Sequence, residues 1–308
     1  MDQHLRDLLA SVLKTDPEAS LDDEGRQAIL YAMLGQHQSE QLEALWRFVG
    51  SITNEFKRSY LLHNLVAVTA KRPIEFALAE RIARSIPATY WRFSALAEIA
   101  NESLARGRQF ATVNSRSGQE FRDRGFRLLR EVEYGLSSIP EDDDDRSSLI
   151  YAAGHSLVRA GELDWAESLA STAKYCPENT EVLLSSAKQR TLRNQTPEAI
   201  QLAKTVAELA IKGPGDFTNR AFDLSAVAEL VFTAGDKEEA RKYLAEAARL
   251  ASASQEANDI DGCKCLGEIA VAFAKQGDLE QARKTADSIT QGARRDYALQ
   301  QIAQLPAI

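Results

Sequence analysis

Three stretches of the chain share one pattern: LSAVAELVFTAGDKEEA at residues 224–240, LGEIAVAFAKQGDLEQA at 266–282 and IYAAGHSLVRAGELDWA at 150–166. In each, apolar residues recur three and four positions apart, which is the spacing of one face of an α-helix. A glycine follows at the same place in all three, and after it comes a charged residue and a second run with helical spacing. The pattern predicts a helix, a tight turn at the glycine and a second helix.

The same register extends over most of the chain. An arginine stands fifteen residues before the predicted loop in most copies and serves as an anchor, although Gly262 breaks the series. The anchors at 26, 58, 92, 146, 179, 220, 262 and 295 are spaced by about 33 residues, with three insertions, which is the period of a helical-repeat array. The predicted loops are at Pro73, Gly107, Gly161, Gly235 and Gly277, with AsnGln at 194–195 in a further copy.

The loop residues have a direct physical interpretation. A glycine at the end of the first helix can adopt the left-handed conformation that closes it. Asp236 and Asp278 are then placed to cap the second helix, with Glu239 or Gln281 three residues later completing a capping-box pattern.

The order of these residues resembles the tetratricopeptide repeat. A leucine-like residue lies eight positions before the loop glycine and a small residue seven before it, as in Ala228 and Ala270, and an alanine lies five after it, as in Ala240 and Ala282. The match covers about residues 26–305, and the resemblance implies an all-α fold: a right-handed α-α superhelix, or solenoid, of about seven antiparallel helix pairs. Its first helices line a concave groove. The family's proline at the end of the second helix is mostly missing, with Pro177 near its place, so the superhelical pitch stays open.

This register divides the chain into an N-terminal cap helix and linker at residues 1–25 and a repeat solenoid at 26–308. About residues 107–125 form an insertion without helical periodicity, which is expected to be a loop between two helices. Because arginine forms paired hydrogen bonds with phosphate and carboxylate, this basic insertion is either a phosphate site or a solvated loop beside the acidic run at 141–145; the second interpretation is favoured. Its arginines are Arg106, Arg108, Arg116, Arg122 and Arg124.

Composition restricts the function classes. The net charge of -8 argues against a surface given over to nucleic acid or an anionic membrane, since both require a positive face. Three cysteines give no disulfide framework and suit a reducing compartment, so the expected location is cytoplasmic. No apolar run approaches the roughly 18 residues typical of a membrane span, and no membrane partner is expected.

Polar and aromatic residues on the predicted first helices are the candidate binding residues. By the resemblance they face the groove, where such side chains bind peptides through stacking and hydrogen bonds; the alternative is an ordinary exposed polar face. These groove residues are Tyr60, His63, Ser94, Asn101, Tyr151, His155 and Lys264.

No reaction is predicted. The chain has no phosphate-binding glycine loop, dinucleotide motif or nucleophile elbow, so no catalytic residue and no cofactor is expected. Cys263 and Cys265 point about 200° apart on a helix, which favours packing over a shared metal ion.

The expected function is therefore a non-catalytic protein-protein interaction scaffold that binds a protein or peptide partner in its concave groove. The alternative is a regulator whose Arg-rich insertion contacts nucleic acid or another phosphate-bearing partner. The last helix, Arg295 to Leu305, has no following partner helix and is expected to be a terminal cap or a homodimer contact.

Overall fold

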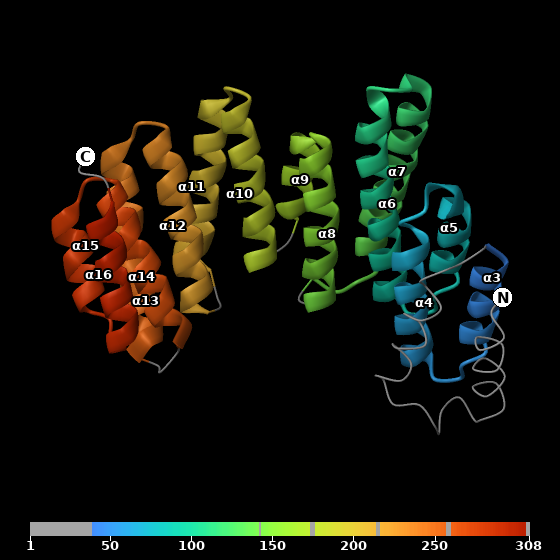
Figure 1. The fold of residues 1–308 in the computed structure, drawn as a ribbon, viewed down its shortest axis with the longest axis horizontal. Helices are drawn as coiled ribbons and strands as arrows, with labels where there is room; N and C mark the ends of the chain where they lie inside the picture. The colour runs from blue at the N-terminus through green and yellow to red at the C-terminus, as the bar shows by residue number, and fades with distance from the viewer. Residues whose placement is uncertain (1–38, 142, 173–175, 214–215, 257–259, 306–308) are drawn as a thin grey trace. The chain divides into compact units, whose positions relative to one another are not determined.

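The computed structural model describes residues 39–141, 143–172, 176–213, 216–256 and 260–305, and in these ranges every regular element is a helix (Figure 1). The chain forms two compact units, residues 1–156 and 157–308, called unit 1 and unit 2. The predicted cap helix and linker at 1–25, and the anchor at Arg26, lie outside the described residues.

In unit 1 the helices alternate in direction along the chain. They are α3 (Ser39–Gly50), α4 (Glu55–Thr69), the short 3-10 helix η1 (Pro73–Glu75), α5 (Phe76–Arg84), α6 (Thr89–Ala111), α7 (Ser115–Leu136) and α8 (Asp144–Ala160), whose last turn belongs to unit 2. In unit 2 follow α9 (Leu163–Ala170), α10 (Pro177–Leu192), α11 (Thr196–Lys212), α12 (Phe217–Thr233), α13 (Lys237–Glu256), α14 (Ile260–Lys275), α15 (Leu279–Asp287) and α16 (Gly292–Gln304).

These helices stack as hairpins. The even-numbered helices from α4 on are here called first helices, and several contact the next first helix of their unit: α4 contacts α6, α10 contacts α12, α12 contacts α14 and α14 contacts α16. Odd-numbered helices are second helices, and α5, α7, α11, α13 and α15 each pack against the first helix that precedes them. Ala100, Ala228 and Ala270, the small positions of the repeat, are fully buried. The helical-repeat character predicted from the spacing is confirmed for the described residues.

The ends of the first helices close as predicted. Four loop residues are left-handed: Gly161, Gly235 and Gly277 at φ of +88°, +98° and +81°, and Asn194, which replaces glycine, at +60°. In each loop the next residue donates its N–H five residues back, as from Asp236 to Val231 O at 3.1 Å, which is the Schellman closure. The predicted caps are also present, since Asp236 accepts from the N–H of Glu239 at 3.1 Å.

The arginine that recurs at the anchor position donates hydrogen bonds to the end of the preceding second helix. The last carbonyls of a helix have no partner within it and must be satisfied from outside. Arg220, near the start of α12 and 9% exposed, donates to Ala210 O and Ile211 O at the end of α11, both at 2.6 Å. Arg146 donates in the same way to Leu136 O and Ile139 O, both at 2.9 Å, after α7.

Packing explains why Gly262 stands at an anchor position where most other repeats have arginine. A Cβ added to Gly262 would lie 2.7 Å from Gln255 N and 3.0 Å from Ala251 O, which are backbone atoms at the end of α13. The start of α14 therefore packs directly against the end of α13 in the place that a guanidinium occupies in other repeats. The break in the arginine series marks a closer approach of two helices.

The prediction of an Arg-rich loop at 107–125 is wrong. Gly107 lies inside α6, and between α6 and α7 only residues 112–114 are outside a helix. The insertion lengthens both helices of one pair. These helices pack closely because their glycines have no side chain: a Cβ on Gly107 would lie 2.7 Å from Arg122 Cγ, and a Cβ on Gly118 would lie 2.9 Å from Ala111 N. Glycines in this contact weaken the helical signal of the sequence, because glycine is a poor helix former.

Replacement of Arg220 with alanine tests whether its guanidinium stabilises the end of α11. The change leaves the buried carbonyl of Ala210 and the part-buried carbonyl of Ile211 without their charged donor, so the free energy of unfolding is expected to fall by about 1.5–3 kcal/mol in urea denaturation. Arg249→Ala, which removes an exposed ion pair with Glu246, is the control and should cost less than about 1 kcal/mol. Equal losses in the two variants would contradict this stabilisation.

Two glycines of α14 provide a matched pair. Gly262→Ala is expected to lower the free energy of unfolding by about 1–3 kcal/mol, because its methyl group would overlap backbone atoms. Gly267→Ala should raise it by up to about 1 kcal/mol, since the nearest atom is Ala298 Cβ at an ordinary 3.8 Å and alanine favours the helix. Urea denaturation followed by circular dichroism distinguishes the two, and a destabilised Gly267→Ala with an unaffected Gly262→Ala would refute the packing described.

Candidate functional site

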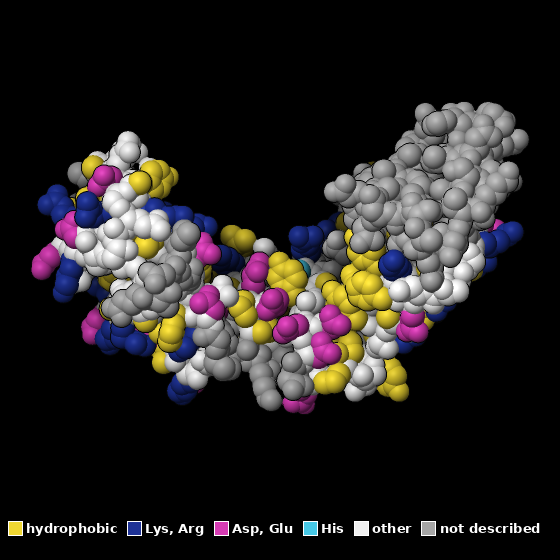
Figure 2. Space-filling view, turned by 90° about the horizontal axis from the view of Figure 1, so that it is seen from below, with side chains coloured by type: hydrophobic (Ala, Val, Ile, Leu, Met, Phe, Trp, Pro, Cys, Tyr) yellow, Lys and Arg dark blue, Asp and Glu magenta, His cyan; other side chains and the backbone are white. Residues whose placement is uncertain are grey.

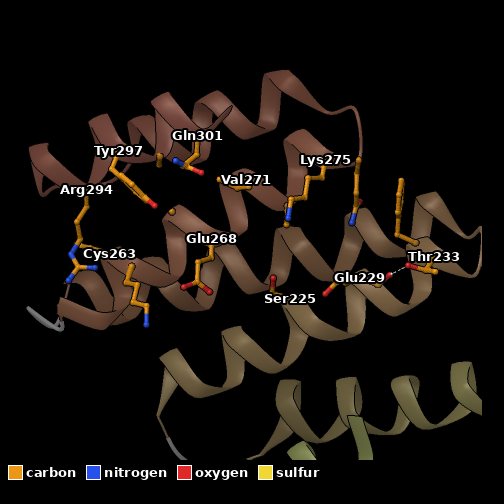
Figure 3. Close-up of a pocket in the computed structure, with 16 residues that line it drawn as sticks. Ser225, Glu229, Thr233, Cys263, Glu268, Val271, Lys275, Arg294, Tyr297 and Gln301 are labelled. Atoms are coloured by element: carbon orange, nitrogen blue, oxygen red, sulfur yellow. Dashed lines mark hydrogen bonds between the residues drawn. The ribbon is translucent and has the colours of Figure 1, made fainter. Parts of the chain in front are cut away.

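A groove in unit 2 runs along the three first helices α12, α14 and α16 (Figure 3). Its volume is about 790 Å³, and its lining combines charged, polar and apolar side chains. Ser225 and Glu229 of α12 lie on one side, Tyr297 of α16 lies on the other, and residues of α14 lie between them. Tyr297 is 64% exposed, so most of its ring is available for contact.

One stripe of α14 faces this groove. It consists of Lys264, Glu268, Val271 and Lys275, which follow one another at intervals of four, three and four residues. At about 3.6 residues per turn these intervals place the four side chains on one face of the helix. The stripe reads cation, carboxylate, apolar group, cation from the start of α14 to its end. Figure 3 shows Glu268, Val271 and Lys275 in this order along the groove.

The charges of the stripe lack partners within the described part of the chain. Glu268 and Lys275 form no ion pair and no side-chain hydrogen bond with a described residue, and Lys264 Nζ lies 5.9 Å from the ring centroid of Phe222 instead of pairing with Glu268. Some exposed charges elsewhere in unit 2 pair, as Lys242 does with Glu239 at 3.2 Å, whereas others, such as Lys284, form no ion pair with a described residue. The groove therefore presents charges that its own surface does not neutralise.

The groove wall also contains a buried acceptor. Gln276 is 8% exposed, and its Oε1 has no hydrogen-bond donor among the described residues. A buried carbonyl without a donor is energetically unfavourable, and a ligand with N–H groups can satisfy it.

The predicted residue Lys264 thus lies on the groove, whereas the other predicted groove residues lie in unit 1. There, Tyr60 and His63 of α4 contact Trp91 of α6 edge to face, with ring centroids 5.4 and 5.2 Å apart. Phe56 adds a third ring at 6.2 Å and is 67% exposed. Trp91, at the centre of this aromatic cluster, was not among the predicted residues. On the face drawn in Figure 2, hydrophobic side chains lie exposed between acidic ones.

His63 connects the aromatic cluster to a polar chain. Its Nε2 lies 3.0 Å from Ser94 Oγ, and 3.9 Å from a carboxylate oxygen of Glu98. Burial lowers the pKa of His63, so the imidazole is neutral at pH 7, and burial raises the pKa of Glu98. Ser94 also hydrogen bonds to Tyr90, whose pKa is raised mainly by burial.

The remaining predicted groove residues lie on α8 and α6. Tyr151 and His155 form their own pair on α8, with ring centroids 4.5 Å apart, and Asn101 is half-buried on α6. The structure thus brings Tyr60 and His63 together and Tyr151 and His155 together. That all of these residues bind one partner stays a prediction.

The arginines of the insertion form ion pairs, hydrogen bonds and ring contacts within unit 1. Arg124, Arg127 and Arg84 surround the buried carboxylate of Glu80, at 3.3, 2.9 and 2.9 Å. Four further arginines have internal contacts. Arg106 donates to Gln109 and to the carbonyl of Lys71, Arg116 pairs with Glu120, Arg122 lies over the ring of Phe126, and Arg108 has a partner as well.

Three further observations concern the described residues alone. Cys263 and Cys265 are both buried on α14, and burial raises the pKa of the Cys265 thiol. These ranges hold no cluster of three or more metal-ligating side chains. Every helix in them is too short or too polar to cross a bilayer.

Comparisons with known proteins assign no family. No family model matches the chain, and neither does any curated protein. Among solved structures, the crystal structure of Ton1535 from Thermococcus onnurineus NA1 is 13% identical, covering 98% of this chain and 96% of that one at a TM-score of 0.28. A circular tandem repeat protein with novel repeat topology is 14% identical over 97% of this chain and 73% of that one, with a TM-score of 0.19.

The pKa of His63 is a test of the aromatic cluster. Its imidazole is expected to titrate below the ordinary value of about 6.5 in NMR, and Trp91→Ala should move it back towards that value by admitting water. Because the folded pKa lies below the unfolded one, the unfolded chain binds more protons as the pH falls, so this group lowers the free energy of unfolding in acid. A His63 pKa above 6.5 would show that pairing with Glu98 outweighs burial.

Proposed function

We propose that this protein is a non-catalytic interaction scaffold that binds a peptide or protein segment in the groove of α12, α14 and α16. The proposal includes the finer architecture implied by the sequence pattern: a tetratricopeptide-like, right-handed superhelix of about seven helix pairs that acts in the cytoplasm. The observation that carries the binding function is the groove itself, with its unpaired charges and its exposed Tyr297.

The dimensions of the groove suit an extended peptide. Lys264 and Lys275 are eleven residues apart on α14, which is about 16 Å at the helical rise per residue. A peptide in extended conformation covers that distance with about five residues. Tyrosine and arginine are enriched among the residues that dominate binding energy at interfaces, and Tyr297 and Arg294 both line the groove.

Binding is favoured over catalysis because the charged groups are spread along the groove. Catalysis requires titratable groups that converge on one reacting atom. The charged side chains of α14 instead alternate in sign over the length of the helix, an arrangement that recognises an elongated ligand.

The alternative function, contact of the Arg-rich insertion with nucleic acid or another phosphate-bearing partner, has less support. Arg124 binds the buried carboxylate of Glu80, and Arg116 pairs with Glu120. Phosphate contacts would have to compete with these pairs.

Selection from a displayed peptide library tests the binding function. Peptides selected on the wild-type protein are expected to lose at least about tenfold in affinity on Tyr297→Ala, because exposed aromatic residues anchor such contacts. They should also lose binding on Gly267→Phe, which fills the groove from its floor. Affinities are measured by fluorescence anisotropy, with folding of each variant verified by circular dichroism.

The matched control is Tyr134→Ala, which removes another exposed tyrosine, 83% exposed, from α7 in unit 1. This change should leave the affinities unaltered. The proposed function is wrong if no peptide is enriched, or if the enriched peptides bind Gly267→Phe and Tyr297→Ala as tightly as the wild type.

A further inference from the structure

The charge order along the groove contains information about the ligand. On α14 the stripe begins with Lys264, continues with the carboxylate of Glu268 and ends with Lys275. Each neighbouring helix adds one charged residue to the groove. Arg294 of α16 lies at the end of the groove where α14 begins, and Glu229 of α12 lies on the opposite wall (Figure 3). The groove is thus positive at its ends and negative between them.

The absence of internal pairing makes these charges available. Lys264 and Glu268 are four residues apart, a spacing at which a helix often forms an ion pair, but with lysine first the orientation is the less favourable one. Lys264 lies against Phe222 instead. Glu229, Glu268 and Lys275 form no ion pair with any other residue that the structure describes. A ligand with the opposite charge order would neutralise Lys264, Glu268 and Lys275 at once.

The distances between the charges of α14 predict the spacing of charges in a bound peptide. Lys264 and Glu268 are about 6 Å apart along the helix axis and Lys264 and Lys275 about 16 Å. In an extended peptide these distances correspond to about two and about five residues. Successive side chains of an extended peptide point to opposite faces, so the three charges that face the groove must be an even number of residues apart. An acidic residue opposite Lys264 is then followed two residues later by a basic residue opposite Glu268, and four residues after that by an acidic residue, which the flexible side chain of Lys275 reaches.

We propose that the groove of α12, α14 and α16 selects an extended peptide with the pattern acidic, any, basic, any, any, any, acidic, in either chain direction. This inference rests on the proposed function, since it names the ligand class of the same groove. Glu229 and Glu268 repel a purely acidic ligand, so a nucleic acid or an all-acidic peptide is disfavoured at the centre of the groove.

Two peptide libraries test the pattern. One fixes the three charges as proposed and randomises the other positions, in both chain directions; the other has the same layout with every sign reversed. The wild-type protein is expected to bind the best peptides of the first library at least about tenfold more tightly than the best of the second at low salt. This preference should shrink as the salt concentration rises, because exposed charges are screened.

A charge-swapped protein provides the matched test. The triple variant Lys264→Glu, Glu268→Lys, Lys275→Glu should invert the preference and bind the sign-reversed library more tightly. Lys284→Glu, a charge reversal at an exposed position of α15, should leave the preference unchanged. Circular dichroism confirms that the variants are folded.

The outcomes separate the charge pattern from the binding function. Peptides of both libraries that bind within twofold of each other, or a triple variant that keeps the wild-type preference, overturn the pattern. If their binding is still abolished by Gly267→Phe, the groove remains a binding site and only the pattern is wrong. If no peptide of either library binds in a manner that depends on Gly267, the pattern and the proposed function both fail.

Discussion

Helix ends constrain this structure more than any other feature. Each helix of a stacked array leaves carbonyls at its end, and these must be satisfied where the next helix begins. The first helices solve this with a left-handed residue, such as Gly235 or Asn194, and the second helices with a guanidinium from the following repeat, such as Arg220. Both devices fix where the next helix starts, so the register of one pair determines the register of its neighbour.

The groove follows from that register. Because the pairs start at equivalent places, the first helices α12, α14 and α16 lie side by side and run in the same direction, and equivalent side chains become neighbours. Phe222 and Lys264 each stand two residues after an anchor, and they lie in contact. The same position carries Tyr60 and Ser94 in unit 1, where the side chains pack on Trp91 and on His63. One scaffold position thus gives an aromatic cluster in one unit and a charged groove in the other.

The predictable parts of this structure depend on local backbone geometry. The left-handed glycines, the cap at Asp236 and the burial of Ala270 follow from a few neighbouring residues, and all are confirmed. Gly107 was wrongly assigned to a loop because a glycine that ends a helix and one that lets two helices approach look alike in sequence. Only the packing partner, here Gly118 and Arg122, distinguishes them.

The candidate site was only partly predictable for a related reason. Helical spacing places Lys264 on an exposed face of a first helix, but the groove also depends on the neighbouring helices, which contribute Tyr297 and Glu229. Spacing also misses Trp91, since its role as the centre of the aromatic cluster depends on α4 lying beside α6. Contacts between repeats separated by insertions cannot be derived from the period of one repeat.

Photo-crosslinking tests the central claim most directly, namely that ligand lies along the stripe of α14. A benzophenone amino acid in place of Val271, between Glu268 and Lys275, is expected to crosslink a selected peptide under illumination, and the crosslink should disappear on competition with unlabelled peptide. The same amino acid in place of Lys284, exposed on α15, should give none. A crosslink at 284 that equals or exceeds the one at 271 would contradict the account.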